Sequence, residues 1–181
     1  MEYAQAMQLL ESELRLRGFS ENTLRNYLRA NHDFLSYTKK PIADVVENDL
    51  KLYLANLLST HNAAPATLAL ARSALLFFFN EVLDRSFKKV KTPKIKRKLP
   101  IVASKQELHS LFAHLQPKSR LMVQLMYASG LRVSELVALK VSDVELSEGH
   151  GWVRDGKGGK DRLFIIPPIL ANDLQSFLKG R

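Results

Sequence analysis

Two short segments of this sequence carry side chains whose type and spacing suit chemistry on a phosphate group. In the first, Ser129-Gly-Leu-Arg-Val-Ser-Glu-Leu136, Arg132 follows a glycine break and stands at the start of a short predicted helix. This position points a guanidinium out of a helix N-terminus beside free backbone N–H groups, and both features favour an anion. The alternative is a surface arginine that pairs with Glu135 at spacing i, i+3.

The second segment is a glycine-rich turn, Gly156-Lys-Gly-Gly-Lys160, between two strand-like runs. The pattern predicts a β-hairpin with Lys157 and Lys160 on its loop, where a lysine can reach a phosphate or a leaving oxygen. The alternative is a solvated turn. The run from Gly151 to Lys157 also matches most of a P-loop, but Gly158 stands where Ser or Thr should hold magnesium, and no helix follows. We therefore reject nucleotide binding there.

Other catalytic and metal-binding arrangements find no support in the residue types. The chain contains no cysteine, which excludes disulfides, thiolate zinc sites, iron–sulfur clusters and cysteine nucleophiles. No two of the five histidines have the i, i+4 spacing of a helical zinc site, so no metal is expected. The longest strongly apolar run, Ala74 to Phe79, is far shorter than the ~20 residues of a membrane span. No membrane partner is expected, and the cytoplasm is the default location.

The N-terminal part of the chain is predicted to be entirely helical. Ser20 is a good N-cap, Pro65 suits the first position of a helix, and Gly18 and Pro41 interrupt the apolar periodicity. The expected helices span about residues 3–17, 20–37, 47–59 and 66–83. Four such helices with short connections predict a compact all-α domain.

Nearly all of the net charge of +9 lies in one stretch that follows these helices. Residues 85–98 hold eight Lys or Arg and no acidic residue, whereas residues 1–84 carry a net charge of −2. A polyanion such as nucleic acid is the natural partner of such a stretch, and the alternative is a solvated basic linker. Because the stretch contains Pro93 and no apolar period, we place a domain boundary there.

The part after the basic stretch is predicted to mix helices with a hairpin. Ser104-Lys-Gln-Glu107 is a capping box that opens a helix, a second helix ends at Gly130, and a short one spans residues 132–139. The runs 151–155 and 162–166 are the hairpin strands, and residues 169–178 form a last helix.

Taken together, these segments resemble the tyrosine recombinases, or phage integrases, and within that family the Xer-type recombinases. The resemblance rests on the arginine segment 129–136, on the hairpin Gly156-Lys-Gly-Gly-Lys-Asp-Arg162, and on the segment Leu99-Pro-Ile-Val-Ala-Ser104 at the start of the second part. It implies a mainly α fold. A four-helix SAM-like core-binding domain (1–86) and a basic linker (87–98) precede the α+β N-terminal part of a catalytic domain with a β-hairpin (99–181).

The family breaks DNA by attack of a tyrosine on a phosphodiester, which forms a 3′-phosphotyrosine and a free 5′-hydroxyl without metal or nucleotide cofactor. By this resemblance, Arg132 matches the first catalytic arginine, which stabilises charge on the scissile phosphate. Lys157 matches the hairpin lysine, the general acid to the leaving 5′-oxygen, and is preferred to Lys160. Glu135 matches an accessory acidic position that orients the site.

The partner that the resemblance implies is a double-stranded DNA recombination site. Further protomers are implied for a full-length protein, two on DNA and four in a synapse, with resolution of chromosome dimers as the biological setting. DNA contacts are expected from both the helical domain and the basic stretch. The residues expected to make them are Arg25, Arg29, Arg72, Lys88, Lys89, Lys91, Lys96, Arg97 and Lys160.

The sequence departs from the family pattern in one respect. The family continues with a His-x-x-Arg box and a nucleophilic tyrosine near the C-terminus, whereas none of the five tyrosines here occupies that place. We therefore expect a DNA-binding fragment of a recombinase that cannot cleave DNA alone. The alternative is a naturally short, non-catalytic DNA-binding or regulatory protein related to recombinases.

Overall fold

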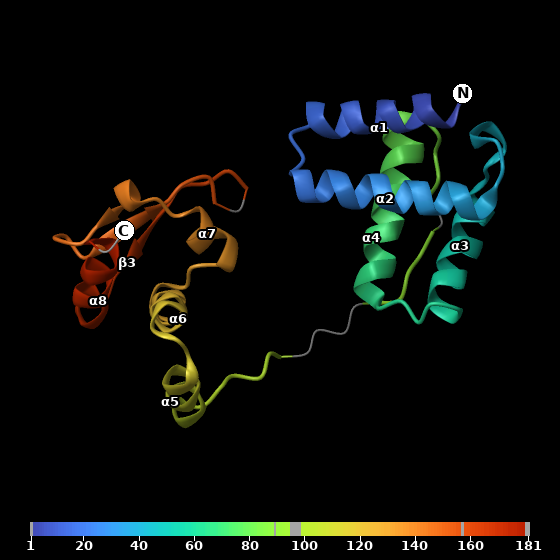
Figure 1. Cartoon of the computed structure of the whole chain (residues 1–181). Helices are drawn as coiled ribbons and strands as arrows, with labels where there is room; N and C mark the ends of the chain where they lie inside the picture. The colour runs from blue at the N-terminus through green and yellow to red at the C-terminus, as the bar shows by residue number, and fades with distance from the viewer. Residues whose placement is uncertain (1, 89, 95–98, 157, 180–181) are drawn as a thin grey trace. The chain divides into compact units, whose positions relative to one another are not determined.

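A computed structural model describes residues 2–88, 90–94, 99–156 and 158–179. The chain divides into two compact units, Met1–Leu99 and Pro100–Arg181, which we call the first and second unit (Figure 1). Most of the described residues are helical, and the strands are confined to the second unit. The predicted fold class, a mainly α chain with a helical first domain and an α+β second part, is confirmed.

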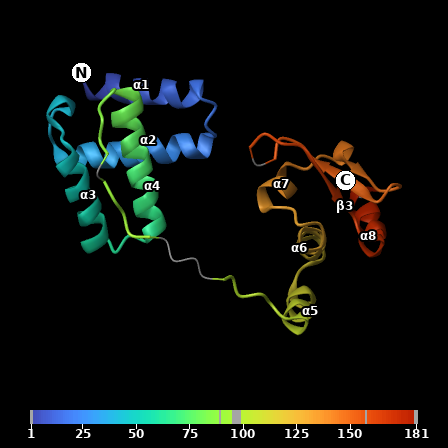
Figure 2. The same cartoon turned by 180° about the vertical axis from the view of Figure 1, so that it is seen from behind.

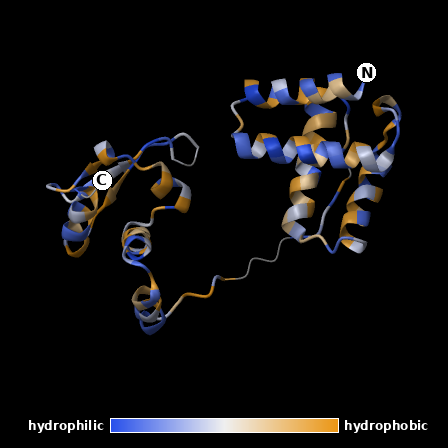
Figure 3. Ribbon diagram, viewed as in Figure 1, coloured by the Kyte–Doolittle hydropathy of each residue, from blue (hydrophilic) through white to orange (hydrophobic). Residues whose placement is uncertain are grey.

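The described residues of the first unit form four α-helices, whose ends follow from local sequence signals. Ser20 caps α2 by accepting a hydrogen bond from the Thr23 N–H (3.3 Å), and Pro65 is the first residue of α4. The helices are α1 (Tyr3–Leu16), α2 (Glu21–Thr38), α3 (Glu47–Ser59) and α4 (Pro65–Leu76), with a short 3-10 turn, η1 (Ile42–Asp44), before α3. In Figure 3 most of these helices carry hydrophilic as well as hydrophobic residues, as amphipathic helices do.

The end of α4 differs from the expected continuous α-helix. The chain continues as a π-helical segment, η2 (Phe77–Val82), which places three consecutive phenylalanines around the helix end. Phe78 and Phe79 are fully buried, whereas Phe77 packs edge-on against Phe19 (5.5 Å between ring centroids). The wider π-helical turn therefore places Phe77 against Phe19 while Phe78 and Phe79 lie in the core.

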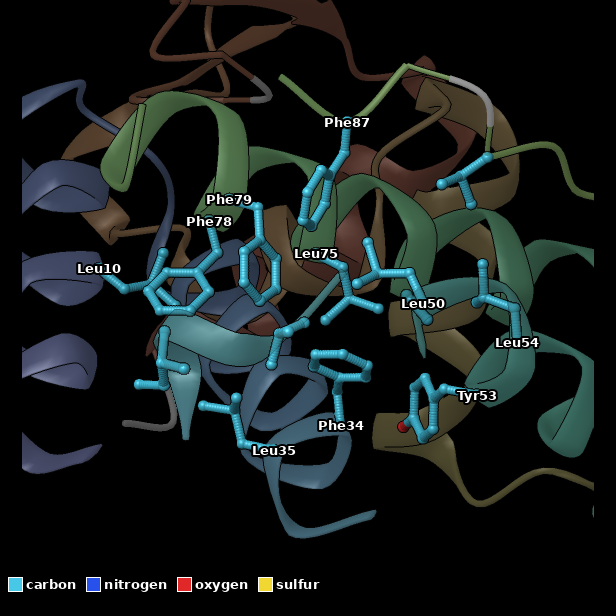
Figure 4. Packing of buried hydrophobic residues seen from close by; sticks show 14 of the residues in the cluster. Leu10, Phe34, Leu35, Leu50, Tyr53, Leu54, Leu75, Phe78, Phe79 and Phe87 are labelled. Carbon is cyan, nitrogen blue, oxygen red and sulfur yellow. The ribbon is translucent and has the colours of Figure 1, made fainter. Parts of the chain in front are cut away.

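The core of the first unit lies among α1, α2, α3, α4 and η2 (Figure 4). Phe34 from α2 packs edge-on against Tyr53 from α3 (5.4 Å) and against Phe79 (5.8 Å). The buried amide of Asn31 donates to the Tyr27 carbonyl in its own helix and to the Ala74 carbonyl of α4, which ties the two helices together.

Residues 85–88 and 90–94, which we call the basic strap, lie in both views between α3 and α4 (Figures 1 and 2). Phe87 and Val90 were expected to belong to a linker, but both side chains are buried in the core of the first unit. Phe87 stacks on Phe79 (5.0 Å), and its backbone N–H and carbonyl both bond to the side chain of Asn80. The many lysines around Phe87 and Val90 in the sequence led us to predict a linker, so these two apolar core residues were missed.

Further hydrogen bonds hold the strap along its length. The Arg85 guanidinium donates to the carbonyls of Ile42 and Val45, so this cation is used inside the unit. The backbone N–H of Lys88 donates to Glu47 (2.9 Å). The side chains of the strap's described lysines, Lys88, Lys91 and Lys94, are exposed.

The second unit opens with helices that the capping signals predict. Ser104 and Glu107 form the expected reciprocal capping box, and Gly130 ends α6 in the left-handed conformation (φ +66°). The helices are α5 (Lys105–His114), α6 (Pro117–Ser129), α7 (Val133–Ala138) and α8 (Pro168–Lys179), with a 3-10 turn, η3 (Val141–Asp143), after α7.

The hairpin of the second unit is part of a three-stranded antiparallel sheet in the order β1-β2-β3. The strands are β1 (Val144–Glu145), β2 (His150–Val153) and β3 (Arg162–Ile165), and β1 is a strand that the sequence pattern did not predict. A Cβ on Gly151 would lie 2.5 Å from the Phe164 ring, so the sheet requires glycine there. Val153, Phe164 and Ile166 are buried with residues of α6 and α8.

Candidate active site

The candidate site is a cluster of two arginines around one carboxylate, built from α7, β3 and the end of α6. Arg132 is the N-cap of α7, and both its backbone N–H and its Nη1 donate to Glu135 (2.9 and 2.7 Å). Arg162, the first residue of β3, donates from Nη2 to the carboxylate as well (2.7 Å). Glu135 therefore accepts three hydrogen bonds, and the two from guanidinium groups are also ion pairs.

The geometry around Arg132 modifies the sequence expectation. We expected free backbone N–H groups beside this guanidinium, but the N–H of Arg132 itself is taken by Glu135. The i, i+3 ion pair with Glu135 is present, yet the Arg132 side chain keeps 56% of its surface exposed. A guanidinium has five N–H donors, so Arg132 can hold Glu135 and still offer donors to a second anion.

Glu135 is ionised throughout the neutral range. Its pKa is lowered to about 2, chiefly because its carboxylate accepts the Arg132 backbone N–H. Burial acts in the opposite direction, and the two guanidiniums lower the pKa further. Any stabilisation from this shift is present above the ordinary glutamate pKa and is lost as the pH falls towards 2. The cluster consequently carries a net charge of +1 at neutral pH.

The glycine turn of the hairpin lies against this cluster. A Cβ built on Gly156 would stand 3.6 Å from Glu135 Oε1, so the turn backbone approaches the carboxylate closely. The Gly156 N–H donates to the Lys160 carbonyl (3.0 Å), which closes the turn. Lys157, the residue after Gly156, lies outside the described residues. The side chain of Lys160 is exposed.

Asp161 fixes the base of the turn. Its carboxylate accepts the Asp155 backbone N–H and the Arg154 guanidinium (2.9 Å each), and Arg154 also covers the Trp152 ring (4.9 Å). The Arg154 hydrogen bond is the main reason that the pKa of Asp161 is lowered. The turn is thus held at both ends beside Glu135.

Replacing Gly156 with alanine is expected to destabilise the second unit by about 3 kcal/mol, because the new Cβ would lie 2.8 Å from the Lys160 carbonyl oxygen. A backbone oxygen in a closed turn cannot move away cheaply. Urea unfolding followed by the fluorescence of the single tryptophan, Trp152, measures this unit alone. Gly158→Ala is the control: it meets nothing within 4 Å, so only its positive φ costs about 1 kcal/mol. Equal losses in the two variants would contradict the clash.

The residues predicted to contact DNA are not equally free to do so. Arg25 and Arg29 are exposed one turn apart on α2, and Arg29 lies 3.7 Å from Asp33. Arg72 is half-buried and donates from Nε to the Val90 carbonyl (2.6 Å), which gives it a role inside the first unit. Of the strap lysines, Lys88 and Lys91 are exposed. The remaining predicted residues, Lys89, Lys96 and Arg97, lie outside the described residues.

Arg162 is the member of the cluster that sequence reasoning missed. It joins the cluster from 27 residues beyond Glu135 and also donates to the Gly130 carbonyl (3.3 Å). A signal was present, because Arg162, Phe164 and Ile166 alternate along the strand and share a face. A charged residue on the inward face of a strand needs a partner, and that requirement points to a buried carboxylate.

Two kinds of feature are absent from the described residues. They contain no group of three or more His, Asp or Glu that could hold a metal ion. No helix within the same residues is both long enough and apolar enough to cross a membrane.

Comparison with known proteins matches both units to one family. Residues 7–89 match the model of the phage integrase N-terminal SAM-like domain, and residues 102–179 match that of the phage integrase family. The tyrosine recombinase XerA of Thermococcus kodakarensis is 35% identical over 175 residues, and that of Pyrococcus furiosus is 33% identical over 171. These alignments cover 94% and 93% of this chain but only 60% and 58% of the relatives.

Solved structures share the fold at lower identity. A Tn1549 transposon integrase in complex with transposon right end DNA has a TM-score of 0.69 at 18% identity, with 97% of this chain and 65% of that chain covered. A lambda integrase tetramer bound to a Holliday junction has a TM-score of 0.66 at 19% identity, with 96% and 53% covered. With the two family models matching consecutive parts of the sequence, the chain belongs to the phage integrase family, the tyrosine recombinases, and is Xer-like.

Proposed function

We propose that this chain is the DNA-binding part of a site-specific tyrosine recombinase and carries a portion of its catalytic site. The observation that carries the proposal is the cluster of Arg132, Glu135 and Arg162 against the turn at Gly156. This arrangement supports a phosphate site because an exposed guanidinium is held in one orientation by a buried carboxylate. Membership of the phage integrase family supports DNA as the molecule that carries this phosphate.

In the proposed reaction a tyrosine attacks the scissile phosphodiester and becomes linked to the 3′-phosphate, and the 5′-oxygen leaves. Arg132 stabilises the charge that develops on the phosphate oxygens, and Glu135 orients Arg132. Lys157 protonates the leaving 5′-oxygen, with Lys160 as the alternative donor. No tyrosine of this chain stands at the nucleophile position of the family pattern, so cleavage belongs to the complete enzyme. The proposed reaction uses no metal or cofactor.

The proposed partners are a double-stranded recombination site and further recombinase protomers, two on one site and four in the synapse. The first unit, whose core includes Phe87 and Val90 of the predicted linker (87–98), and the partial catalytic domain (99–181) both bind DNA in this proposal. We also propose that the protein acts in the cytoplasm, where chromosomal DNA lies. Its proposed biological role is the resolution of chromosome dimers. The proposal rests on similarity to XerA recombinases over about 60% of their length.

A naturally short DNA-binding protein related to recombinases is the second candidate, favoured by the departure from the family pattern. Both candidates bind DNA, so the reading frame of the gene distinguishes them. Codons for His-x-x-Arg and a tyrosine beyond Arg181 support the recombinase, and a stop codon supports the short protein.

The purified chain is expected to bind duplex DNA without reacting with it. A duplex of about 30 base pairs, three helical turns, is a suitable probe for fluorescence anisotropy. Affinity should fall steeply with salt, because lysines and arginines displace condensed counterions. A nicked suicide substrate should give no covalent adduct on a denaturing gel. Absence of DNA binding would contradict the proposed function, and an adduct that maps to any of the five tyrosines would contradict the assignment of the nucleophile.

A further inference from the structure

Arg162 is the part of the cluster to which neither the family pattern nor the proposed reaction gives a task. Its Nη2 donates to Glu135 and to the Gly130 carbonyl, so it links β3 to α7 and to the end of α6. Its side chain is 36% exposed, compared with 56% for Arg132 and 6% for Glu135. Arg132 is therefore the more accessible of the two cations, and Arg162 stands behind it.

The position of Glu135 creates an electrostatic conflict for a phosphate site. The carboxylate must stay in place, because it caps the Arg132 N–H and holds Nη1 (2.7 Å). A phosphate that binds the same guanidinium then approaches a full negative charge, and like charges at this range repel strongly. With Arg132 alone, the pair would be neutral and would attract an anion weakly.

We infer that Arg162 is a positioning residue that neutralises Glu135, so that Arg132 can bind a DNA phosphate while Glu135 continues to hold it. This inference rests on the proposed function. The second guanidinium compensates the carboxylate at Oε2, whereas the Arg132 guanidinium bonds to Oε1. The net charge of +1 is thereby available at the more exposed arginine.

The test follows the ¹⁵N resonance of the Arg132 Nε–H in the whole chain while duplex DNA of random sequence is added. Arg132→Lys assigns this signal. In the wild-type chain the signal should shift with saturating DNA and yield a dissociation constant for this site. Arg162→Gln is expected to weaken that constant about tenfold, because Glu135 then opposes the phosphate uncompensated. Arg162→Lys, which keeps the charge, should weaken it less.

The decisive variant is the pair Glu135→Gln with Arg162→Gln. The side-chain amide that replaces the carboxylate still offers an oxygen to the Arg132 N–H, and the net charge equals that of the wild type. The pair is expected to regain most of the affinity that Arg162→Gln loses, because no carboxylate remains to be neutralised. The control for loss of one positive charge is Arg120→Gln, at an exposed arginine on α6. It should leave the dissociation constant measured at Arg132 nearly unchanged.

Each outcome separates the inference from the proposed function. If DNA leaves the wild-type Arg132 signal unshifted, the proposed phosphate site is wrong. If the wild type responds and Arg162→Gln responds equally well, the inference is wrong. It is also wrong if the double variant stays as weak as Arg162→Gln, since Arg162 would then contact DNA itself. Should Arg162→Gln unfold the second unit, Glu135→Gln alone is compared with the double variant; equal constants support neutralisation and a tenfold difference overturns it.

Discussion

A chain in which Lys88, Lys91 and Lys94 are all glutamine is expected to bind duplex DNA about a hundredfold more weakly at about 0.1 M salt. These side chains are exposed on the basic strap, whose backbone is fixed to the first unit by Phe87, Val90 and Glu47. Three lost phosphate contacts should also reduce the slope of log K against log salt by about 2.7. A fixed backbone strengthens the expectation, because less chain entropy is lost on binding than for a free linker.

The control for this prediction is a triple variant with the same loss of charge elsewhere. Lys39, Lys105 and Lys179 are exposed and lie outside the strap. Their replacement by glutamine lowers the net charge equally. It should change the slope of log K against log salt by less than the loss of one phosphate contact would. Similar losses in both triple variants would mean that overall charge, and not the strap, governs the affinity.

Replacing Phe79 with alanine is expected to lower the free energy of unfolding of the first unit by about 3–5 kcal/mol. Phe79 is fully buried and contacts rings from three parts of the unit: Phe34 of α2, Phe78 beside it and Phe87 of the strap. Its removal leaves a cavity that these rings cannot fill without leaving their own partners. The strap should loosen with it, because Phe87 loses the ring on which it stacks.

Two optical probes separate the units in this measurement. Trp152 is the single tryptophan and belongs to the second unit, whereas helical circular dichroism reports both units. Phe79→Ala should move the dichroism transition to lower urea and leave the tryptophan transition in place. Leu16→Ala, at a residue that is 82% exposed, should change stability by no more than about 0.5 kcal/mol. A loss below about 1 kcal/mol for Phe79→Ala would mean that the core closes around the gap.

Local signals predicted the helices of this chain well. The predicted third helix, residues 47–59, has the bounds of α3, and the caps at Ser20, Ser104 and Gly130 act where they were expected. Each of these signals acts within about four residues, so neighbouring residues suffice to read it. The short strand β1 was missed because two residues carry no period.

Long-range packing decided what the sequence could not predict. Phe87 and Val90 are surrounded by lysines, and only contact with α4 and η2 shows that they are core residues. Arg132 and Glu135 are neighbours on one helical turn and could be paired from spacing alone. Arg162 is far from them in the sequence and reaches them only through the fold of the hairpin. The periodicity of residues along the chain gives no signal over such a separation.

The strap has a consequence for the synthesis of the protein on the ribosome. Among the described residues of the first unit, the anchors Phe87 and Val90 are the last core residues to be translated, after its four helices. At about 5–20 residues per second, the chain from the end of α4 to Phe87 takes about 0.5–2 s to translate, and the flank of Phe79 is uncovered during that time. Until Phe87 emerges, this aromatic surface is open to water and to chaperones. Because the strap emerges ahead of the second unit, it closes the first unit before the second unit has left the ribosome.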